Sequence, residues 1–264
     1  MKINIIFVSL VSLILASCDF IVNKFSFFPD KTTVIHEDQL PINCKKINIL
    51  TSDNIRLDAL YFSNNDNSKN VIIYFHGNGG NIYYRIRECE QLSQMGLNVL
   101  LVSYRGYAKS EGSPSEKGVY IDGESAVNYA TNELKFKLSN VVIFGRSLGT
   151  AIAIEVSQFK EISKLILITP LSSGGDVADV NGYGSLRLIS GNPFNSIKKI
   201  NNIRCPILVI HGDKDEVIPY NLGKKIFDTF KGTKILITVK NGDHNNLENV
   251  DPKLYWGSIE SYLK

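Results

Sequence analysis

Three polar side chains in this sequence follow short apolar segments and are of the types that nucleophilic catalysis requires: Ser147, Asp215 and His244. Ser147 is the centre of GRSLG at 145–149, which follows the apolar run 141–144 and precedes an expected helix. A serine on a sharp turn between a strand and a helix is exposed and lies near the positive end of that helix. The GxSxG motif also occurs by chance in tight turns, so alone it does not identify a nucleophile.

Several acidic residues follow the apolar run 207–210, in the sequence GDKDEVIP. A carboxylate at a strand end can orient a histidine and stabilise its charged form. Asp215 is the predicted partner because it lies beyond the turn that begins with the glycine. Asp213 is interpreted as a turn residue, Glu216 as a solvated residue, and His211, inside the strand end, as structural.

A glycine-rich loop, HGNGG at 76–80, follows the apolar run 71–75. Loops of small residues let backbone N–H groups point at a developing negative charge. We therefore predict an oxyanion hole formed by the backbone N–H groups of Asn78 and Leu148. A phosphate-binding loop is the competing interpretation, but the sequence has neither GxxxxGK[ST] nor GxGxxG with an acidic partner. His76 is interpreted as a structural residue that braces the loop.

The histidine of the predicted site, His244, lies in the loop after the apolar run 234–239. A single loop histidine is usually a surface residue. Here it completes an ordered set, because Ser147, Asp215 and His244 follow one another in the order found in α/β-hydrolases. The motifs constrain one another, so together they predict a catalytic triad more strongly than any one of them.

Alternating strands and helices must position these residues. Strands are predicted at 46–50, 56–62, 71–75, 98–103, 141–144, 164–169, 207–210 and 234–239, and helices at 82–95, 115–132, 150–157, 222–230 and 254–263. The first two strands form an antiparallel pair. The other strands are mostly continuous apolar runs, which are typical of a parallel sheet covered by helices on both faces. The glycine-rich segment 171–202 has no clear elements and is predicted to be an inserted cap.

From about Lys46 to Tyr262 the chain resembles the α/β-hydrolases, specifically the small-capped Bem46 and alpha/beta hydrolase domain-containing 13 and 17 families. The resemblance rests on IYFHGNGGN (73–81), YRGYAKSEG (104–112), GRSLG (145–149) and CPILVIHGDKD (205–215). It implies an α/β-hydrolase domain over 46–264 with a short cap at 171–202. The sequence departs from the family pattern at Gly79, at Thr150 and within 172–191.

The resemblance implies a serine hydrolase that cleaves carboxylic ester or thioester bonds through an acyl-enzyme intermediate, with no metal or cofactor. One alternative is a peptidase or amidase, similar to serine aminopeptidases, that uses the same triad. Another is a non-catalytic, membrane-tethered binding protein, against which the intact triad argues. Around the site, Arg105 and Ser110 are expected to hold loops in place. Arg146 either lies near the pocket or covers the next strand with its stem.

The N-terminal residues 1–17 are typical of an export signal, with Lys2 followed by a mostly apolar run that is short for a membrane span. The sequence LASC that ends at Cys18 resembles the bacterial lipoprotein box, in which the cysteine thiol receives a diacylglycerol. This implies a lipid-anchored protein of the bacterial cell envelope, with 18–45 as tether and N-terminal arm. Asp19 resembles the inner-membrane retention signal of diderm bacteria. An ordinary secretory signal or uncleaved anchor is the alternative.

Composition, charge and cysteine content limit the class of protein and its partners. The 264 residues, 44% hydrophobic and 21% charged, are ordinary for a soluble globular protein that can bury a core. A net charge of +3, without a long basic run, predicts no nucleic-acid partner. Beyond Cys18, the cysteines are Cys44, Cys89 and Cys205, which we expect to be buried thiols, and no CxxC pair suggests zinc.

Overall fold

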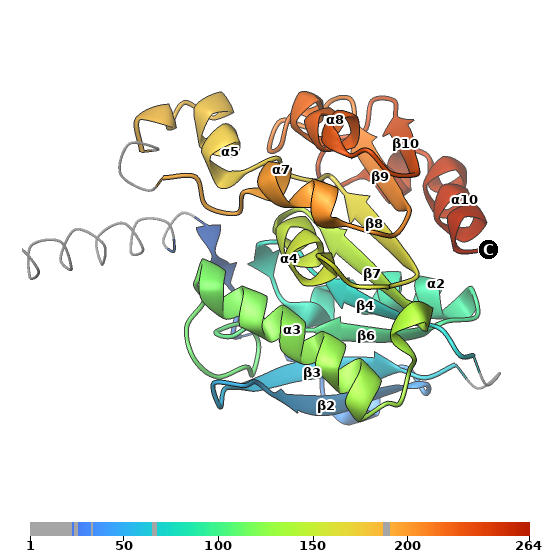
Figure 1. Cartoon of the computed structure of the whole chain (residues 1–264). Coiled ribbons are helices and arrows are strands. Elements are labelled where there is room, and N and C mark those ends of the chain that lie inside the picture. Colours follow the sequence, from blue (N-terminus) through green and yellow to red (C-terminus); the bar gives the residue numbers. More distant parts are fainter. Residues whose placement is uncertain (1–22, 24–25, 33, 65–67, 187–190) are drawn as a thin grey trace, which may run out of the picture.

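The computed structural model describes residues 23, 26–32, 34–64, 68–186 and 191–264, so the predicted signal peptide and Cys18 lie outside the described residues. Within them, an eight-stranded sheet has the order β10-β9-β8-β7-β4-β6-β3-β2 (Figure 1). Its strands are β2 (Cys44–Leu50), β3 (Arg56–Phe62), β4 (Val71–Phe75), β6 (Asn98–Val102), β7 (Val141–Arg146), β8 (Lys164–Ile168), β9 (Ile207–Gly212) and β10 (Lys234–Val239). The six strands from β10 to β6 in this order run parallel to one another, and β2 and β3 form an antiparallel pair, as predicted. Strand β3 is also antiparallel to its other neighbour, β6.

The central strands are buried on both faces, which explains why their sequences are apolar without alternation. One core cluster packs beneath α3 (Glu116–Asn132), α4 (Leu148–Ser157) and α8 (Tyr220–Thr229). The other packs beneath α2 (Ile86–Gln94) and α10 (Pro252–Leu263). The predicted α/β-hydrolase architecture, a mostly parallel sheet between helical layers, is therefore confirmed (Figure 1).

Element boundaries differ from the predictions in informative places. The predicted helix 82–95 begins with a separate 3₁₀ turn, η2 (Ile82–Arg85), before α2. The predicted helix 150–157 begins two residues earlier, at Leu148, directly after Ser147. Helix α4 thus follows the turn with no linker, and its N-terminus lies at the serine.

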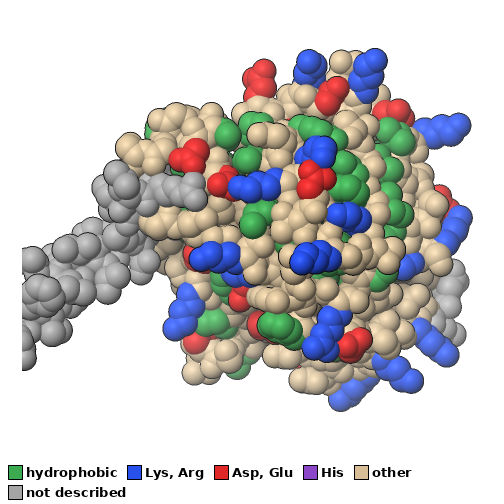
Figure 2. Space-filling model, turned by 45° about the horizontal axis from the view of Figure 1, so that its top comes forward, with side chains coloured by type: hydrophobic (Ala, Val, Ile, Leu, Met, Phe, Trp, Pro, Cys, Tyr) green, Lys and Arg blue, Asp and Glu red, His purple; other side chains and the backbone are tan. Residues whose placement is uncertain are grey.

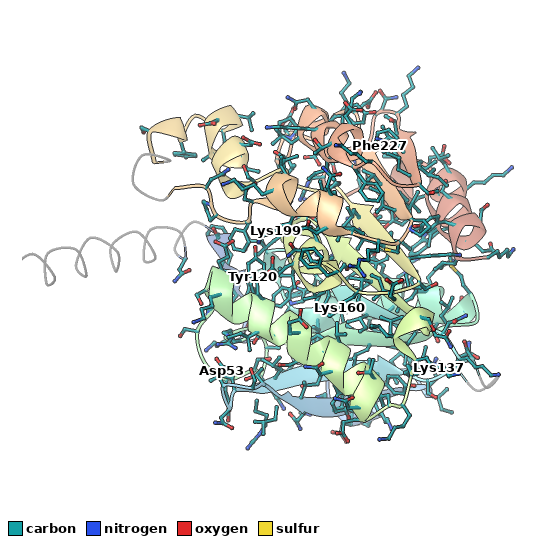
Figure 3. All side chains as sticks on the ribbon, in the orientation of Figure 1. Asp53, Tyr120, Lys137, Lys160, Lys199 and Phe227 are labelled. Atoms are coloured by element: carbon teal, nitrogen blue, oxygen red, sulfur yellow. The ribbon has the colours of Figure 1, made fainter. Side chains whose placement is uncertain are left out.

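The segment 171–202 contains short helices that the sequence analysis did not find: α5 (Gly174–Val180), η4 (Gly184–Leu186), α7 (Ser196–Lys199) and η5 (Ile200–Asn202). Helix α5 is capped by Ser173, whose side chain accepts a hydrogen bond from the Asp176 N–H. Lys199 joins this segment to α3, with its Nζ 3.1 Å from the hydroxyl of Tyr120 (Figure 3). The segment is therefore attached to the core by specific contacts.

The N-terminal arm, for which the sequence predicted no strand, contributes a short one. β1 (Phe28–Pro29) pairs in parallel with β5 (Gly79–Gly80) to form a separate two-stranded sheet. Phe27 is buried, and its ring packs edge-on against Phe194, with 5.9 Å between centroids. The arm thus joins the glycine-rich loop to the segment that contains the short helices.

Lys and Arg side chains are spread over the face shown in Figure 2, with acidic side chains among them. Of the helices that the structure describes, none combines the length and apolar character needed to cross a bilayer. The three cysteines in the described part of the chain are unpaired. Cys89 and Cys205 are buried as expected, but Cys44 is only half-buried because it begins β2, at the edge of the sheet. Burial raises the pKa of the Cys205 thiol to about 12.

Candidate active site

Ser147 lies on a strained turn between β7 and α4, with φ 54° and ψ −123°. Close packing around the turn requires the two flanking glycines. A Cβ on Gly145 would lie 2.6 Å from the Gly149 carbonyl oxygen, and one on Gly149 would collide with the backbone oxygen of Phe75. A non-glycine residue rarely keeps such a backbone unless the surroundings enforce it, and strained residues of this kind concentrate at functional sites.

The structure brings the three predicted triad residues together. His244 Nε2 lies 2.8 Å from Ser147 Oγ, and His244 Nδ1 lies 2.8 Å from Asp215 Oδ2. Asp215 follows β9, and His244 follows the neighbouring strand β10, so the parallel sheet delivers both to the same edge. This is the geometry in which a histidine can remove the serine proton while a carboxylate fixes its tautomer.

Asp215 is buried and held from two sides. Its Oδ1 accepts hydrogen bonds from the backbone N–H groups of Val217 (3.0 Å) and Ile218 (2.8 Å). Burial alone would raise the pKa of this carboxyl group, but hydrogen bonds from His211 and His244 outweigh burial and hold its pKa well below the usual range. Asp215 is therefore a carboxylate at neutral pH. Asp213 and Glu216, the other candidates, are exposed.

His211 contacts the triad, a position that the sequence pattern did not predict. Its Nε2 lies 3.2 Å from Asp215 Oδ2 and 2.8 Å from the carbonyl oxygen of Ile218. Gly223 of α8 packs directly on its ring, where a Cβ would collide with Nδ1. His211 is thus structural, as expected, but the structure it supports is the position of Asp215. Its spacing of four residues before Asp215, across one turn, is the signal that could have indicated this.

The predicted oxyanion loop lies against the serine because β4, which leads into it, is the neighbour of β7 in the sheet. A Cβ on Gly77 would be 3.4 Å from the Cβ of Ser147. Within the described residues, the Asn78 N–H donates no hydrogen bond. Leu148 is the first residue of α4, where backbone N–H groups have no acceptor inside the helix. Both N–H groups are therefore available to a ligand.

Contacts from distant segments fix this loop. The Tyr107 hydroxyl donates to the Asn78 carbonyl oxygen (2.8 Å), and the Tyr104 hydroxyl donates to the His76 carbonyl oxygen (2.7 Å). The backbone N–H of Phe28 donates to Asn78 Oδ1 (2.9 Å). The loop conformation thus depends on the N-terminal arm and on the turn after β6.

His76 itself is completely enclosed. Its ring stacks on Tyr104, with 4.3 Å between centroids, and its Nδ1 lies 2.7 Å from the Gly77 carbonyl oxygen. Its Nε2 has no partner among the described residues. Burial lowers the pKa of His76 to about 3, so the ring is neutral at physiological pH. These contacts fit a bracing residue rather than a proton carrier.

Arg146, for which the sequence left two positions open, is buried and lines the site. Its Nη1 lies 3.5 Å from both Glu88 Oε1 and Glu248 Oε2. The Tyr74 hydroxyl donates to Glu88 at 2.6 Å. Arg146 therefore links the serine turn to α2 and to α9 (Leu247–Val250), which follows the His244 loop.

Arg105 and Ser110 hold the turn after β6 rather than the serine itself. Arg105 forms ion pairs at 2.8 Å with Asp122 of α3 and with Asp53 of the β2–β3 turn, which Figure 3 labels. The Ser110 hydroxyl donates to the Ser103 carbonyl oxygen and accepts from the Asp58 N–H. The turn carries Tyr104 and Tyr107, so these contacts support the oxyanion loop indirectly.

A cavity of about 390 Å³ opens at the triad, lined by Gly77, Asn78, Gly79, Arg85, Arg146, Ser147, Val217, His244 and Asn245. None of these residues belongs to the segment 171–202. A larger hollow of about 760 Å³ between the β2–β3 turn and α3 contains none of the triad or loop residues. In the described ranges, no group of three His, Cys, Asp or Glu side chains could hold a metal ion.

Comparisons with known proteins identify the family and the fold of the chain. A family model described as alpha/beta hydrolase fold matches residues 70–188. Human alpha/beta hydrolase domain-containing protein 17B is 30% identical over 199 residues, which cover 75% of this chain and 68% of that protein. Protein bem46 of Schizosaccharomyces pombe is 34% identical over 187 residues, covering 66% of this chain and 62% of that protein.

Among solved structures, an esterase of Pyrococcus furiosus superposes with a TM-score of 0.75 at 19% identity, covering 90% of this chain and 97% of that chain. At this level of identity the likeness concerns the fold. The overall fold therefore has a solved structural counterpart, whereas the serine turn and the cavity of this chain must be interpreted from its own residues.

Proposed function

The chain belongs to the α/β-hydrolase family, in the group with Bem46 and alpha/beta hydrolase domain-containing 17B, and from this we propose that it is a serine hydrolase of carboxylic esters or thioesters. The observation that carries the proposal is the continuous chain of hydrogen bonds from Ser147 through His244 to Asp215 at the cavity. The family supports hydrolase activity in general. The assignment of Ser147 as nucleophile and of an acyl substrate is our proposal.

In the first half of the reaction, His244 Nε2 takes the hydroxyl proton as Ser147 Oγ attacks the substrate carbonyl carbon. The carbonyl oxygen becomes an oxyanion, which the N–H groups of Asn78 and Leu148 stabilise. The proton on His244 then passes to the departing alkoxide or thiolate, leaving an acyl group on Ser147. Asp215 remains ionised throughout and stabilises the transient imidazolium.

In the second half, His244 removes a proton from a water molecule that attacks the acyl carbonyl, and the same two N–H groups stabilise the second oxyanion. The proton returns to Ser147 as the carboxylic acid leaves. Ser147 and His244 are thus the residues that exchange protons with the substrate and water. Arg146 contributes by holding the serine turn against α2, through its contacts with Glu88.

A fluorophosphonate probe tests the nucleophile. We expect one covalent label on the wild-type chain and none on Ser147→Ala, with unchanged circular dichroism spectra. Ser185→Ala, at an exposed serine of η4, is the matched control and should be labelled like the wild type. A folded Ser147→Ala protein that labels fully would refute the assignment. Faster turnover of aminoacyl amides than of acyl esters would favour the peptidase alternative. Absence of any label on the wild-type protein would favour the binding-protein alternative.

We also propose that the chain is anchored in a bacterial envelope membrane through a lipid on Cys18, with Asp19 favouring the inner membrane in a diderm cell. The support is the LASC sequence at 15–18 after an apolar run. The intact mass of the exported protein should include a diacylglycerol, and Cys18→Ser should remove it and release the protein from the membrane fraction. An unmodified Cys18 on exported wild-type protein would refute the anchor.

A further inference from the structure

Arg85 is a residue of the cavity to which the triad chemistry gives no function. It is the last residue of η2, the 3₁₀ turn that follows the oxyanion loop. Its side chain is half-buried and lines the same cavity as Ser147 and His244. A guanidinium group carries five N–H donors and keeps its charge at every relevant pH. Arg85 therefore places a permanent positive charge in the cavity that contains Ser147 and His244.

The two arginines of the cavity differ in their partners. Arg146 is paired with Glu88 and Glu248. The side chain of Arg85 forms no ion pair and no hydrogen bond within the described part of the chain. The described residues that line the cavity include no Asp or Glu side chain. On the side that faces the cavity, Arg85 thus meets no carboxylate of the described residues.

A partly buried cation without a partner is poorly satisfied, and burial of charge is costly unless an opposite charge or hydrogen-bond acceptors complete it. The acceptors that suit a guanidinium best are carboxylate and phosphate oxygens, which can take two parallel N–H bonds. Among the cavity residues, Asn78 Oδ1 already accepts from the N-terminal arm, and Asn245 can offer only a neutral amide oxygen. The substrate is then the natural source of the missing acceptor.

We propose that Arg85 binds an anionic group of the substrate, so that the preferred esters or thioesters carry a carboxylate or phosphate close to the scissile carbonyl. This inference rests on the proposed hydrolase function, because the carbonyl must lie over Ser147 while the anion contacts Arg85. Arg85 is then a specificity-determining residue. A guanidinium keeps its protons, so Arg85 can distinguish substrates without taking part in proton transfer.

Matched substrate pairs test the proposal on both sides of the scissile bond. For the acyl side, p-nitrophenyl hydrogen glutarate is compared with p-nitrophenyl valerate. For the leaving group, the S-acetyl thioester of 3-mercaptopropanoate is compared with that of butanethiol. The readout is the ratio of kcat/KM for the anionic member to that for the neutral member. This ratio cancels any general loss of folding or of nucleophile strength.

In at least one pair, Arg85→Met should lower this ratio about tenfold or more, the range typical of one hydrogen bond to a charged group. Arg85→Lys should retain part of the preference, because it keeps the charge but not the planar fork. Arg87→Met is the matched control, since Arg87 is exposed and does not line the cavity, and should keep the wild-type ratio. An unchanged ratio in Arg85→Met for both pairs would overturn the proposal.

Binding without turnover separates this proposal from the proposed function. Calorimetry with butylphosphonate and with butanoate distinguishes a phosphate-like from a carboxylate ligand and requires no catalysis. We expect the better of the two to lose about tenfold or more in affinity in Arg85→Met, and equal affinity in both proteins would overturn the anion site. Failure of the wild-type protein to react with the fluorophosphonate probe would instead reject the hydrolase proposal. The calorimetry would then test only whether Arg85 binds an anion.

Discussion

The two sides of Ser147 are held in different ways. On the acid–base side, Asp215 and His244 follow adjacent parallel strands, and both are nearly fully buried. On the oxyanion side, Asn78 belongs to a glycine loop held by the N-terminal arm, 50 residues earlier, and by Tyr107. The acid–base side therefore depends on the central sheet, whereas the oxyanion side depends on segments that meet only in the complete fold.

The largest effect is expected on the acid–base side, from Asp215→Asn. The amide cannot stabilise the imidazolium and favours the wrong histidine tautomer, so we expect kcat to fall about 10⁴-fold. Asp213→Asn, at an exposed carboxylate two residues earlier, is the control and should stay near wild type. Steady-state kinetics on an acetyl ester measure both. A loss below tenfold in Asp215→Asn would show that the carboxylate does not act through His244.

The oxyanion side should respond less strongly, because its donors are backbone groups that side-chain changes can only displace. Asn78→Ala removes the acceptor for the Phe28 N–H, and Phe28→Pro removes the donor from the other end of this bond. Loss of a complete oxyanion donor costs about 10²–10³ in kcat, so each variant should lose about tenfold. Asn128→Ala, at an exposed asparagine of α3, serves as the control.

A double-mutant cycle sharpens this prediction. If the two residues act through their shared hydrogen bond, the double variant should lose no more activity than the more damaging single variant. Independent, multiplying losses would mean that the arm and the loop affect catalysis separately, and the oxyanion side would not depend on the arm as argued.

The sequence predicted the acid–base side of Ser147 better than the oxyanion side. The strands and the serine turn could be predicted because continuous apolar runs and GRSLG are local signals, and each triad residue follows such a run. The pairing of β1 with the loop could not, because Phe28 and Pro29 carry no strand pattern and acquire a partner only through long-range folding. Helices α5 and α7 are short and lie in a glycine-rich segment, so their single capping residues, Ser173 and Asn195, were not enough to predict them.

His76 should make the oxyanion side sensitive to acid. Its pKa is about 3 in the folded protein, against an ordinary value of 6.5, because burial disfavours the charged ring. The unfolded chain therefore binds the proton first, and the stability that neutral His76 contributes above pH 6.5 is lost as the pH falls toward 3. From pH 7.5 to 5 the free energy of unfolding should fall by up to about 2 kcal/mol through this residue.

Urea denaturation at pH 7.5 and 5 measures this effect in wild type and in His76→Asn. The variant should be less stable at pH 7.5 but lose less stability on acidification. His36→Asn, at an exposed histidine, should retain the wild-type pH dependence. Equal pH dependence in wild type and His76→Asn would mean that the ring can be protonated in the folded loop.

The smallest expected effect concerns acyl chain length, because the described residues that line the cavity offer little apolar surface. Among the described residues lining the cavity, Val217 is the aliphatic side chain, and the segment 171–202 contributes none. Each buried CH₂ contributes about 0.8 kcal/mol, or roughly a fourfold gain in kcat/KM, but only where apolar surface receives it. We therefore expect p-nitrophenyl esters of four to twelve carbons to differ by much less than fourfold per CH₂ in detergent-free solution. A sustained fourfold rise per carbon would contradict the open cavity and indicate an acyl tunnel, for which Val217 is the aliphatic residue that the described lining offers.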